Sequence, residues 1–191
     1  MEKLQDSALI KHYLDGNGYA FEVLYNRYRV RLFGYLNGLL PHQPAEAEDI
    51  YQQTWLKVIA RLPEYQDQGC FGAWLFRIGR NLLIDHVRRQ KRQPQLLEID
   101  REEMPEISAA PGTEPWRTMD ESELGNAIRK AVETLSPDQK EVFLLRQEGV
   151  SFKEIAEIQQ CSLNTALARM QYALKKLKKQ LVSIDQGGLI Q

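Results

Sequence analysis

The chain has 191 residues, of which 43% are apolar, and its 25 lysine and arginine residues nearly balance 26 acidic ones, giving a net charge of −1. This length accommodates one or two domains with buried cores. The N-terminal segment MEKLQDSALIKHYL has no long apolar core, and no apolar run approaches the roughly 20 residues that cross a bilayer, so we expect neither a signal peptide nor membrane insertion.

The cysteine and histidine positions argue against a metal site and against an enzyme. Cys70 and Cys161 lie far apart and form neither a metal-ligand spacing nor a disulfide framework, which fits a reducing cytoplasm. His12, His42 and His86 show no ligand or triad spacing, and the sequence has no glycine-rich phosphate loop. We therefore expect a cytoplasmic, non-enzymatic protein with no metal, no other cofactor and no small-molecule substrate.

Helical periodicity dominates the sequence and strand signals are almost absent, so we expect an all-α fold. Glycines and prolines interrupt the periodicity and divide the first half into helices expected at 4–14, 19–40, 45–62 and 71–93. The second helix carries a broad apolar stripe, formed by Phe21, Leu24, Tyr25, Tyr28, Leu32, Tyr35 and Leu36. The third presents a polar, amide-rich face with an acid, which suits a protein partner.

A polar stripe runs along the helix expected at 71–93 and consists of Arg77, Asn81, Asp85 and Arg88. This mixture of side chains suits base edges as well as phosphates. Phe71, Trp74 and Phe76 crowd the start of the helix, where rings beside arginines suit unpaired bases, and the preceding loop, 64–70, is placed to hold an extruded base. The alternative is a solvated stripe and buried rings; for the rings by themselves we favour the core.

Residues 94–119 differ in composition from the segments on either side. They contain four prolines and six acids against two arginines, with little periodicity, which is typical of a linker. Helical patterns resume near residue 120. The sequence therefore predicts two small helical domains, 1–93 and 120–183, joined by a flexible, acidic, proline-rich linker and followed by a frayed tail, 184–191.

The second domain contains a helix-turn-helix pattern. Ser136-Pro137 opens a helix that Gly149 closes, and Ser151 with Glu154 forms a capping-box spacing for the next helix. A third helix, capped by Ser162, has an apolar stripe that we expect to be buried, formed by Leu163, Ala166, Met170, Leu174, Leu177 and Leu181. The outward face is then expected to carry Leu167, Ala168, Gln171, Tyr172 and Lys175. This arrangement favours reading of the DNA major groove, and a plain helical hairpin is the alternative.

Basic residues concentrate in two segments of this otherwise balanced chain. Residues 77–92 and residues 169–179 each carry a local charge of +5, whereas 94–119 carries −4. Phosphate contacts supply most of the non-specific affinity for DNA, so two such patches indicate a nucleic-acid binder. Solvated helix ends produce the same pattern and remain the alternative.

Taken together, these segments resemble the sigma factors of bacterial RNA polymerase, in the compact extracytoplasmic-function (ECF) type, over nearly the whole chain. AEDIYQQTWLKVIARL is similar to the family's core-binding motif, through Asp49, Gln52 or Gln53, Thr54 and Trp55. FGAWLFRIGRNLLIDHVRRQKR is similar to its promoter-melting and −10-reading helix, with hallmark positions at Trp74, Leu75, Ile78, Asn81, Asp85, Arg88 and Arg89. LSPDQKEVFLLRQEGVSFKEIAEIQQCSLNTALARMQYALKKLKK is similar to its −35-reading domain.

The resemblance implies a subunit that binds core RNA polymerase, recognises the −10 and −35 promoter elements and promotes DNA melting, with an anti-sigma factor as a further partner. It implies polymerase contacts at Asp49, Gln52, Gln53 and Trp55. It implies −10 DNA contacts at Phe71, Trp74, Arg77, Asn81, Asp85, Arg88 and Arg89. It implies −35 DNA contacts at Thr165, Leu167, Ala168, Arg169, Gln171, Tyr172 and Lys175.

The recognition helix departs from the family form S-x-G-T-V-[KR]-S-R, because the chain has Asn164, Ala166, Leu167 and Ala168 at the positions of Gly, Val, the basic residue and Ser. Leu167 cannot donate a bidentate pair to guanine, so we expect −35 reading to rest on Gln171, Tyr172 and Lys175, or on phosphates. A stand-alone helix-turn-helix regulator remains the alternative, although such a regulator needs no polymerase-binding or melting motifs.

Overall fold

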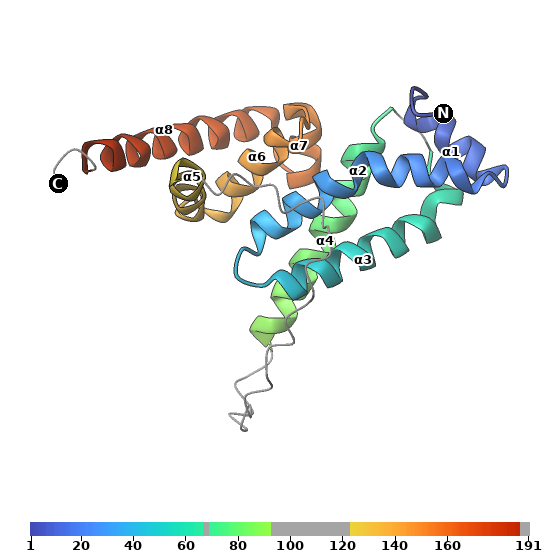
Figure 1. Ribbon diagram of the computed structural model, residues 1–191, viewed down its shortest axis with the longest axis horizontal. Helices are drawn as coiled ribbons and strands as arrows, with labels where there is room; N and C mark the ends of the chain where they lie inside the picture. The colour runs from blue at the N-terminus through green and yellow to red at the C-terminus, as the bar shows by residue number, and fades with distance from the viewer. Residues whose placement is uncertain (67–68, 93–122, 188–191) are drawn as a thin grey trace, which may run out of the picture.

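The computed structural model describes residues 1–66, 69–92 and 123–187, and the regular elements within these ranges are helices (Figure 1). In chain order they are α1 (Asp6–Leu14), α2 (Gly18–Leu39), α3 (Pro44–Arg61), the 3-10 helix η1 (Leu62–Glu64), α4 (Phe71–Arg92), α5 (Glu123–Glu133), α6 (Pro137–Gln147), α7 (Phe152–Gln159) and α8 (Leu163–Gly187). The expected all-α fold is confirmed. The expected linker, 94–119, lies outside the described residues, and α8 continues past residue 183 into the segment expected to fray.

Local capping interactions explain where the helices of the second domain begin. The backbone N–H of Ser151 donates to Glu154 Oε2 at 2.8 Å, and the N–H of Glu154 donates to Ser151 Oγ at 3.3 Å, which forms the expected capping box of α7. Gln160 ends α7 in the left-handed region at φ 54°. Ser162 Oγ then accepts the N–H of Thr165 at 3.1 Å and caps α8. The short turn between α7 and α8 follows from these residues.

The core of the first domain forms around α2, which contacts α1, α3 and α4. Its predicted apolar stripe is confirmed, since Leu24, Leu32 and Leu36 are fully buried and the aromatic members are at least half-buried. α4 packs closely against α2 and α3 at Gly79. A Cβ added to Gly79 would lie 3.3 Å from Leu32 Cδ1 of α2 and 3.4 Å from Thr54 Oγ1 of α3. This contact fixes α4 against α2 and α3. Within the described ranges, no helix combines the length and apolarity needed to cross a bilayer.

The buried face of α8 matches the predicted stripe at Ala166, Met170 and Leu177 and departs from it at Leu163 and Leu174. Ala166, Ala173 and Leu177 are buried, whereas Leu163 and Leu174 are about half exposed. The reason is that α5 packs beside the second half of α8, and Ala173 and Leu177 form a small cluster with buried side chains of 131–135. The apolar pattern of α8 alone could not report this neighbour, beside which Ala173 rather than Leu174 is buried.

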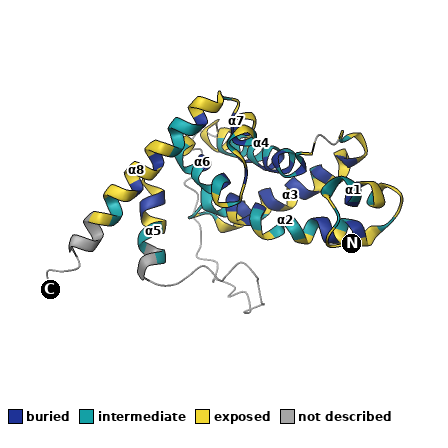
Figure 2. Cartoon of the chain, turned by 90° about the horizontal axis from the view of Figure 1, so that it is seen from above, coloured by how far each residue is buried: buried dark blue, intermediate teal, exposed yellow. Residues whose placement is uncertain are grey.

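The two segments predicted as domains pack against each other, an arrangement that the sequence does not predict. α6 contacts α2, and α7 contacts α4, as Figures 1 and 2 show from two directions. Buried residues of α6 to α8, including Val142, Leu145 and Ile155, belong to the same apolar cluster as the core of α1 to α4. The second half of α8 extends away from this body (Figure 1). The helix-turn-helix therefore lies directly on the first domain.

Candidate nucleic-acid interface

The outward face of α4 carries the predicted polar stripe. Asn81, Asp85, Arg88 and Arg89 are exposed, while Leu75 and Ile78 point into the core. Arg77 is less accessible, because its Nη2 atom lies 3.6 Å from Glu157 Oε2 of α7. The stripe thus presents amide, carboxylate and guanidinium groups along one side of a helix that the core holds rigidly, which is the set of groups that reads base edges and phosphates. Contact between these residues and DNA stays a prediction.

A pocket of about 510 Å³ opens beside the first turns of α4. Aromatic and charged side chains dominate its walls, joined by one amide, one thiol and one methyl group. The lining residues are Arg61, Glu64, Tyr65, Gln66, Cys70, Ala73, Trp74, Arg77 and Glu157. The rings of Tyr65 and Trp74 have centroids 4.6 Å apart and are tilted by 43°. The pocket lies where the sequence predicted a place for an extruded base. Aromatic faces beside guanidinium groups can stack an unpaired base and neutralise its phosphate.

Phe71 does not line this pocket, and its burial gives no support to its predicted contact with −10 DNA, which stays a prediction. It is 1% exposed, and its ring packs against those of Tyr28, Tyr65 and Trp74 at centroid distances of 5.4 to 5.8 Å. As the first residue of α4, it points back toward α2 and supports the two rings that line the pocket. Phe76 is fully buried against Tyr35, which confirms the core interpretation for that ring.

The exposed face of α3 carries a second candidate surface. Asp49, Gln52 and Gln53 are all exposed, and Gln53 Nε2 donates to Asp49 Oδ2 at 2.6 Å. Leu56, which follows Gln52 and Gln53 after one turn, is 68% exposed. Helical spacing separates Leu56 from the buried face of α3, which is formed by Ile50, Thr54 and Val58. An apolar residue on the outward face was the one sequence signal that could have added Leu56 to the predicted polymerase contacts.

Trp55, in contrast, belongs to the core, and its burial gives no support to its predicted contact with polymerase, which stays a prediction. It is 5% exposed, and its ring lies 4.9 Å from that of Tyr25 and 5.9 Å from that of Phe21, measured between centroids. The indole therefore holds α3 against α2. The sequence around Trp55 does not indicate whether its ring is buried or exposed. Burial depends on Phe21 and Tyr25 of α2, which are distant in the sequence.

On α8, the predicted outward residues separate into two groups. Gln171, Tyr172 and Lys175 are exposed, whereas Leu167 and Ala168 are half-buried. Thr165 is exposed, but its hydroxyl lies 2.8 Å from Ser162 Oγ and takes part in the cap. The accessible base-reading groups of α8 are thus an amide, a phenol and an ammonium group, without an arginine.

Arg169 is engaged within the domain, which differs from its predicted role in binding −35 DNA. Its Nη2 atom lies 2.6 Å from Asp138 Oδ2 of α6, and its Nη1 atom donates to Gln159 Oε1 of α7 at 2.8 Å. One guanidinium thereby joins α8 to both preceding helices. No local sequence pattern identifies Asp138 and Gln159 as its partners. Among the residues that the structure describes, no group of three or more His, Cys, Asp or Glu side chains is arranged to hold a metal ion.

Comparison with protein families divides the chain into two matched segments. Residues 24–93 match the family described as Sigma-70 region 2, and residues 125–177 match the family described as Sigma-70, region 4. Together these matches cover more than half of the chain. The first contains α3, α4 and the aromatic pocket, and the second contains the helix-turn-helix.

Curated relatives are similar along nearly the whole length. The ECF RNA polymerase sigma-E factor of Haemophilus influenzae is 27% identical over 187 residues, covering 94% of this chain and 97% of the relative. The RNA polymerase sigma-H factor of Pseudomonas aeruginosa is 25% identical over 182 residues, covering 93% and 94%. Both relatives therefore match the two segments and the region between them.

Two solved structures are similar to the fold. The sigma factor RpoE from Bartonella quintana, crystallised with the anti-sigma factor NepR, has a TM-score of 0.63 at 26% identity, covering 85% of this chain and 96% of that one. CnrH in complex with the cytosolic domain of CnrY has a TM-score of 0.66 at 23% identity, covering 94% and 99%. The second similarity is one of fold alone.

Proposed function

The chain belongs to the sigma-70 family as an ECF-type RNA polymerase sigma factor, and from this premise we propose how its described residues share the steps of transcription initiation. In the proposal, α3 docks on core polymerase, α4 captures and opens the −10 element, and α8 reads the −35 element. The pocket beside α4 carries the proposal, because the aromatic rings of Tyr65 and Trp74 line it together with the guanidinium groups of Arg61 and Arg77.

The pocket and the stripe support strand opening without a catalytic group. Melting exchanges base stacking within the duplex for stacking and hydrogen bonding on the protein. Tyr65 and Trp74 supply the stacking surface, and Arg61 and Arg77 supply charge beside it. Asn81 is exposed on the same helix and can donate to and accept from a base edge. The residues therefore favour capture of a displaced single strand that begins at the pocket and continues along α4.

On α3, we propose that polymerase contacts the face formed by Asp49, Gln52, Gln53 and Leu56. An exposed leucine among hydrogen-bonding side chains has the composition of a protein interface, with an apolar centre and a polar rim. Trp55 contributes from beneath by holding α3 in place. A stand-alone regulator would need no such face, and membership of the sigma-70 family disfavours that alternative.

For α8, we propose a −35 element read through Gln171, Tyr172 and Lys175, with Arg169 positioning the helix. Glutamine can pair with adenine in the major groove, and the half-buried Leu167 can contact only apolar groups such as a thymine methyl. We further propose a cytoplasmic location and a partner of the anti-sigma class, since the similar Bartonella quintana protein was crystallised with one.

A binding experiment with purified bacterial core RNA polymerase tests the proposal. The wild-type chain should co-elute with core polymerase in gel filtration, and the complex should bind a promoter fragment that neither component binds alone. If the chain does not bind polymerase but the free chain binds duplex DNA by itself, the protein is a stand-alone regulator and the proposal is wrong.

A further inference from the structure

Tyr28 of α2 connects the N-terminal helix to the start of α4. Its hydroxyl donates to Asp6 Oδ2 in the first turn of α1, and its ring meets that of Phe71 at a centroid distance of 5.4 Å. Tyr28 is 6% exposed, and burial together with the hydrogen bond to Asp6 raises the pKa of its hydroxyl above the ordinary value. The hydroxyl therefore keeps its proton, and one donor side chain joins α1 to α4.

Arg27 engages the other oxygen of the same carboxylate. Its Nη1 atom donates to Asp6 Oδ1, and its Nη2 atom donates to the backbone carbonyls of Glu2 and Leu4, each at 2.9 Å. Two neighbouring residues of α2 thus bind both oxygens of Asp6, and the segment before α1 is tied to the same guanidinium. A carboxylate held on both oxygens has little freedom to turn, so it fixes the direction in which the Tyr28 hydroxyl points.

The first turn of α4 packs tightly on the Tyr28 ring. A Cβ added to Gly72 would lie 3.1 Å from Tyr28 Cε1 and 3.2 Å from the Tyr28 hydroxyl oxygen, which is closer than ordinary van der Waals contact. Phe71 is 1% exposed and meets Tyr28 edge-on, with the ring planes at 69°. Because a packed interior leaves no room for independent movement, a shift of the Tyr28 ring also shifts Phe71.

Phe71 in turn supports the two rings of the pocket. Its centroid lies 5.8 Å from that of Tyr65 and 5.7 Å from that of Trp74, although Phe71 itself does not line the cavity. A base stacks well only on a ring whose face is correctly turned, and rings at a binding site keep their orientation when the side chains behind them are packed. A series of contacts therefore runs from Asp6 through Tyr28 and Phe71 to the pocket.

We propose that Asp6, Tyr28 and Phe71 are positioning residues for base capture. Through them, α1 sets the orientation of the two pocket rings, although none of the described residues that line the pocket belongs to α1. This inference rests on the proposed function of the pocket. It adds a role in that function for α1, which lies outside the segments matched to the two families.

A double-mutant cycle on the purified complex of the full chain with core polymerase tests this role. Fluorescence anisotropy reports affinity for a labelled single-stranded oligonucleotide pool of random sequence, with core polymerase alone as the background. Loss of a stacking ring typically weakens binding about five-fold or more, so Trp74→Ala defines the share of the affinity that the pocket supplies. We expect Phe71→Leu and Tyr28→Phe each to weaken binding about three-fold when Trp74 is present and to cause no further loss in Trp74→Ala.

The cycle separates positioning from a loss of stability, because a destabilised domain weakens binding whether or not Trp74 is present. Phe33→Leu is the matched control, since Phe33 is another buried ring and packs on Tyr51 at a centroid distance of 5.7 Å. It should lower stability in urea denaturation and leave binding of the pool unchanged. Tyr28→Phe keeps the ring and removes only the hydroxyl, so it keeps the test valid if Phe71→Leu does not fold.

Three results would show that the positioning role is wrong: wild-type affinity in the folded variants, an undiminished loss in Trp74→Ala, or an equal loss in Phe33→Leu. Wild-type affinity in Trp74→Ala would overturn the proposed function of the pocket and, with it, this inference. A loss in Trp74→Ala that Phe71→Leu and Tyr28→Phe do not share overturns the inference alone.

Discussion

Asp138 and Arg169 lie 31 residues apart in the sequence and meet at 2.6 Å, where they join the first helix of the helix-turn-helix to its recognition helix. Gln159 of α7 accepts from the same guanidinium, so all three helices share one side chain. Arg169 therefore positions the base-reading residues Gln171 and Tyr172 from the opposite side of α8, and its loss should affect −35 reading without loss of a base contact.

Substitution Asp138→Asn tests this positioning role, because Asp138 lies on α6. We expect thermal unfolding to show about 1 kcal/mol lower stability, a small value since both side chains are partly exposed. We also expect the complex of this variant with core polymerase to bind a duplex promoter fragment more weakly than the wild-type complex does. Arg169→Lys should resemble it, because an ammonium group cannot reproduce the paired contacts. Normal stability with lost DNA binding in Arg169→Lys alone would instead assign Arg169 to the DNA.

Trp55→Ala should destabilise the first domain, because the buried indole packs against Phe21 and Tyr25. Loss of a buried tryptophan typically lowers the free energy of unfolding by about 3–5 kcal/mol. Urea denaturation followed by circular dichroism measures this change. A Trp55→Ala chain that unfolds like wild type and selectively fails to bind polymerase would support the contact predicted from the sequence.

Leu56→Glu should weaken polymerase binding with little effect on folding, because the side chain is 68% exposed. Loss of a hot-spot residue costs about 2 kcal/mol or more, so we expect a loss of at least about ten-fold in affinity if Leu56 lies at the centre of the interface. Gel filtration or surface plasmon resonance with core polymerase measures the change. Leu14→Glu, at another exposed leucine, is the matched control and should bind normally; equal behaviour of the two variants would remove Leu56 from the interface.

Asn81→Ala should impair −10 capture and leave polymerase binding unchanged, since the residue is exposed on α4, whereas the proposed polymerase face belongs to α3. Loss of one base-edge pair corresponds to about 1–3 kcal/mol, or roughly 5- to 150-fold in promoter opening. Permanganate footprinting of the opened strand reports the effect. Asn26→Ala, at an exposed position on α2, serves as control. Wild-type opening by the Asn81 variant would exclude this residue from DNA capture.

Glu148 should make stability depend on pH. Burial raises the pKa of this carboxyl above 4.5, its ordinary value, although Arg31 acts in the opposite direction. The native state then holds the proton more tightly than the unfolded state, so this group's contribution is greatest below 4.5 and declines as the pH rises through the native pKa. Denaturation of wild type and Glu148→Gln across this range should show that decline in wild type only. Parallel pH profiles would contradict it.

The sequence predicted the helices well because their signals are local. Apolar spacing located α2 and α4, and the capping box of Ser151 and Glu154 located α7. Exposure of Asn81, Asp49 and Tyr172 also followed from helical periodicity.

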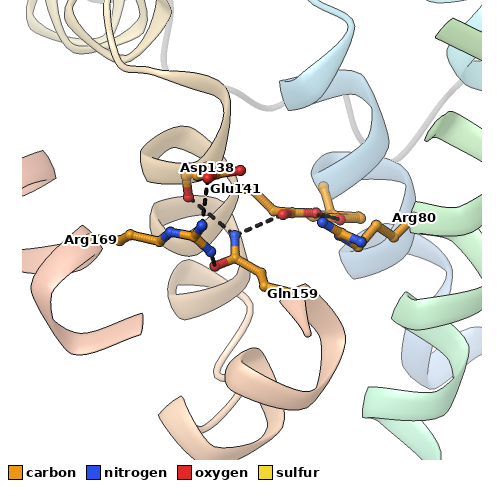
Figure 3. Close-up of polar contacts among 6 residues, drawn as sticks. Arg80, Asp138, Glu141, Gln159 and Arg169 are labelled. Carbon is orange, nitrogen blue, oxygen red and sulfur yellow. Dashed lines mark hydrogen bonds and ion pairs between the residues drawn. The ribbon is translucent and has the colours of Figure 1, made fainter. Parts of the chain in front are cut away.

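The features that periodicity did not locate depend on contacts between distant segments. Phe71 and Trp55 turn toward α2, and Arg169 turns toward α6 and α7; none of these partners is adjacent in sequence. The burial of Ala173 in place of Leu174 depends on α5 in the same way. The contact between the two domains includes Glu141 of α6, whose carboxylate lies 2.8 Å from Arg80 of α4 (Figure 3). Periodicity alone does not identify Arg80 as the partner of this acid. Tertiary packing, which periodicity cannot report, decides these positions.

Run-off transcription with purified core polymerase on a pool of genomic fragments tests the central claim most directly. The account predicts discrete start sites that require the chain, share −10 and −35 sequences, and disappear or weaken strongly with Asn81→Ala. Transcription that stays random or absent, while the free chain binds polymerase-free duplex DNA at specific sites, would contradict a sigma factor and support a stand-alone regulator.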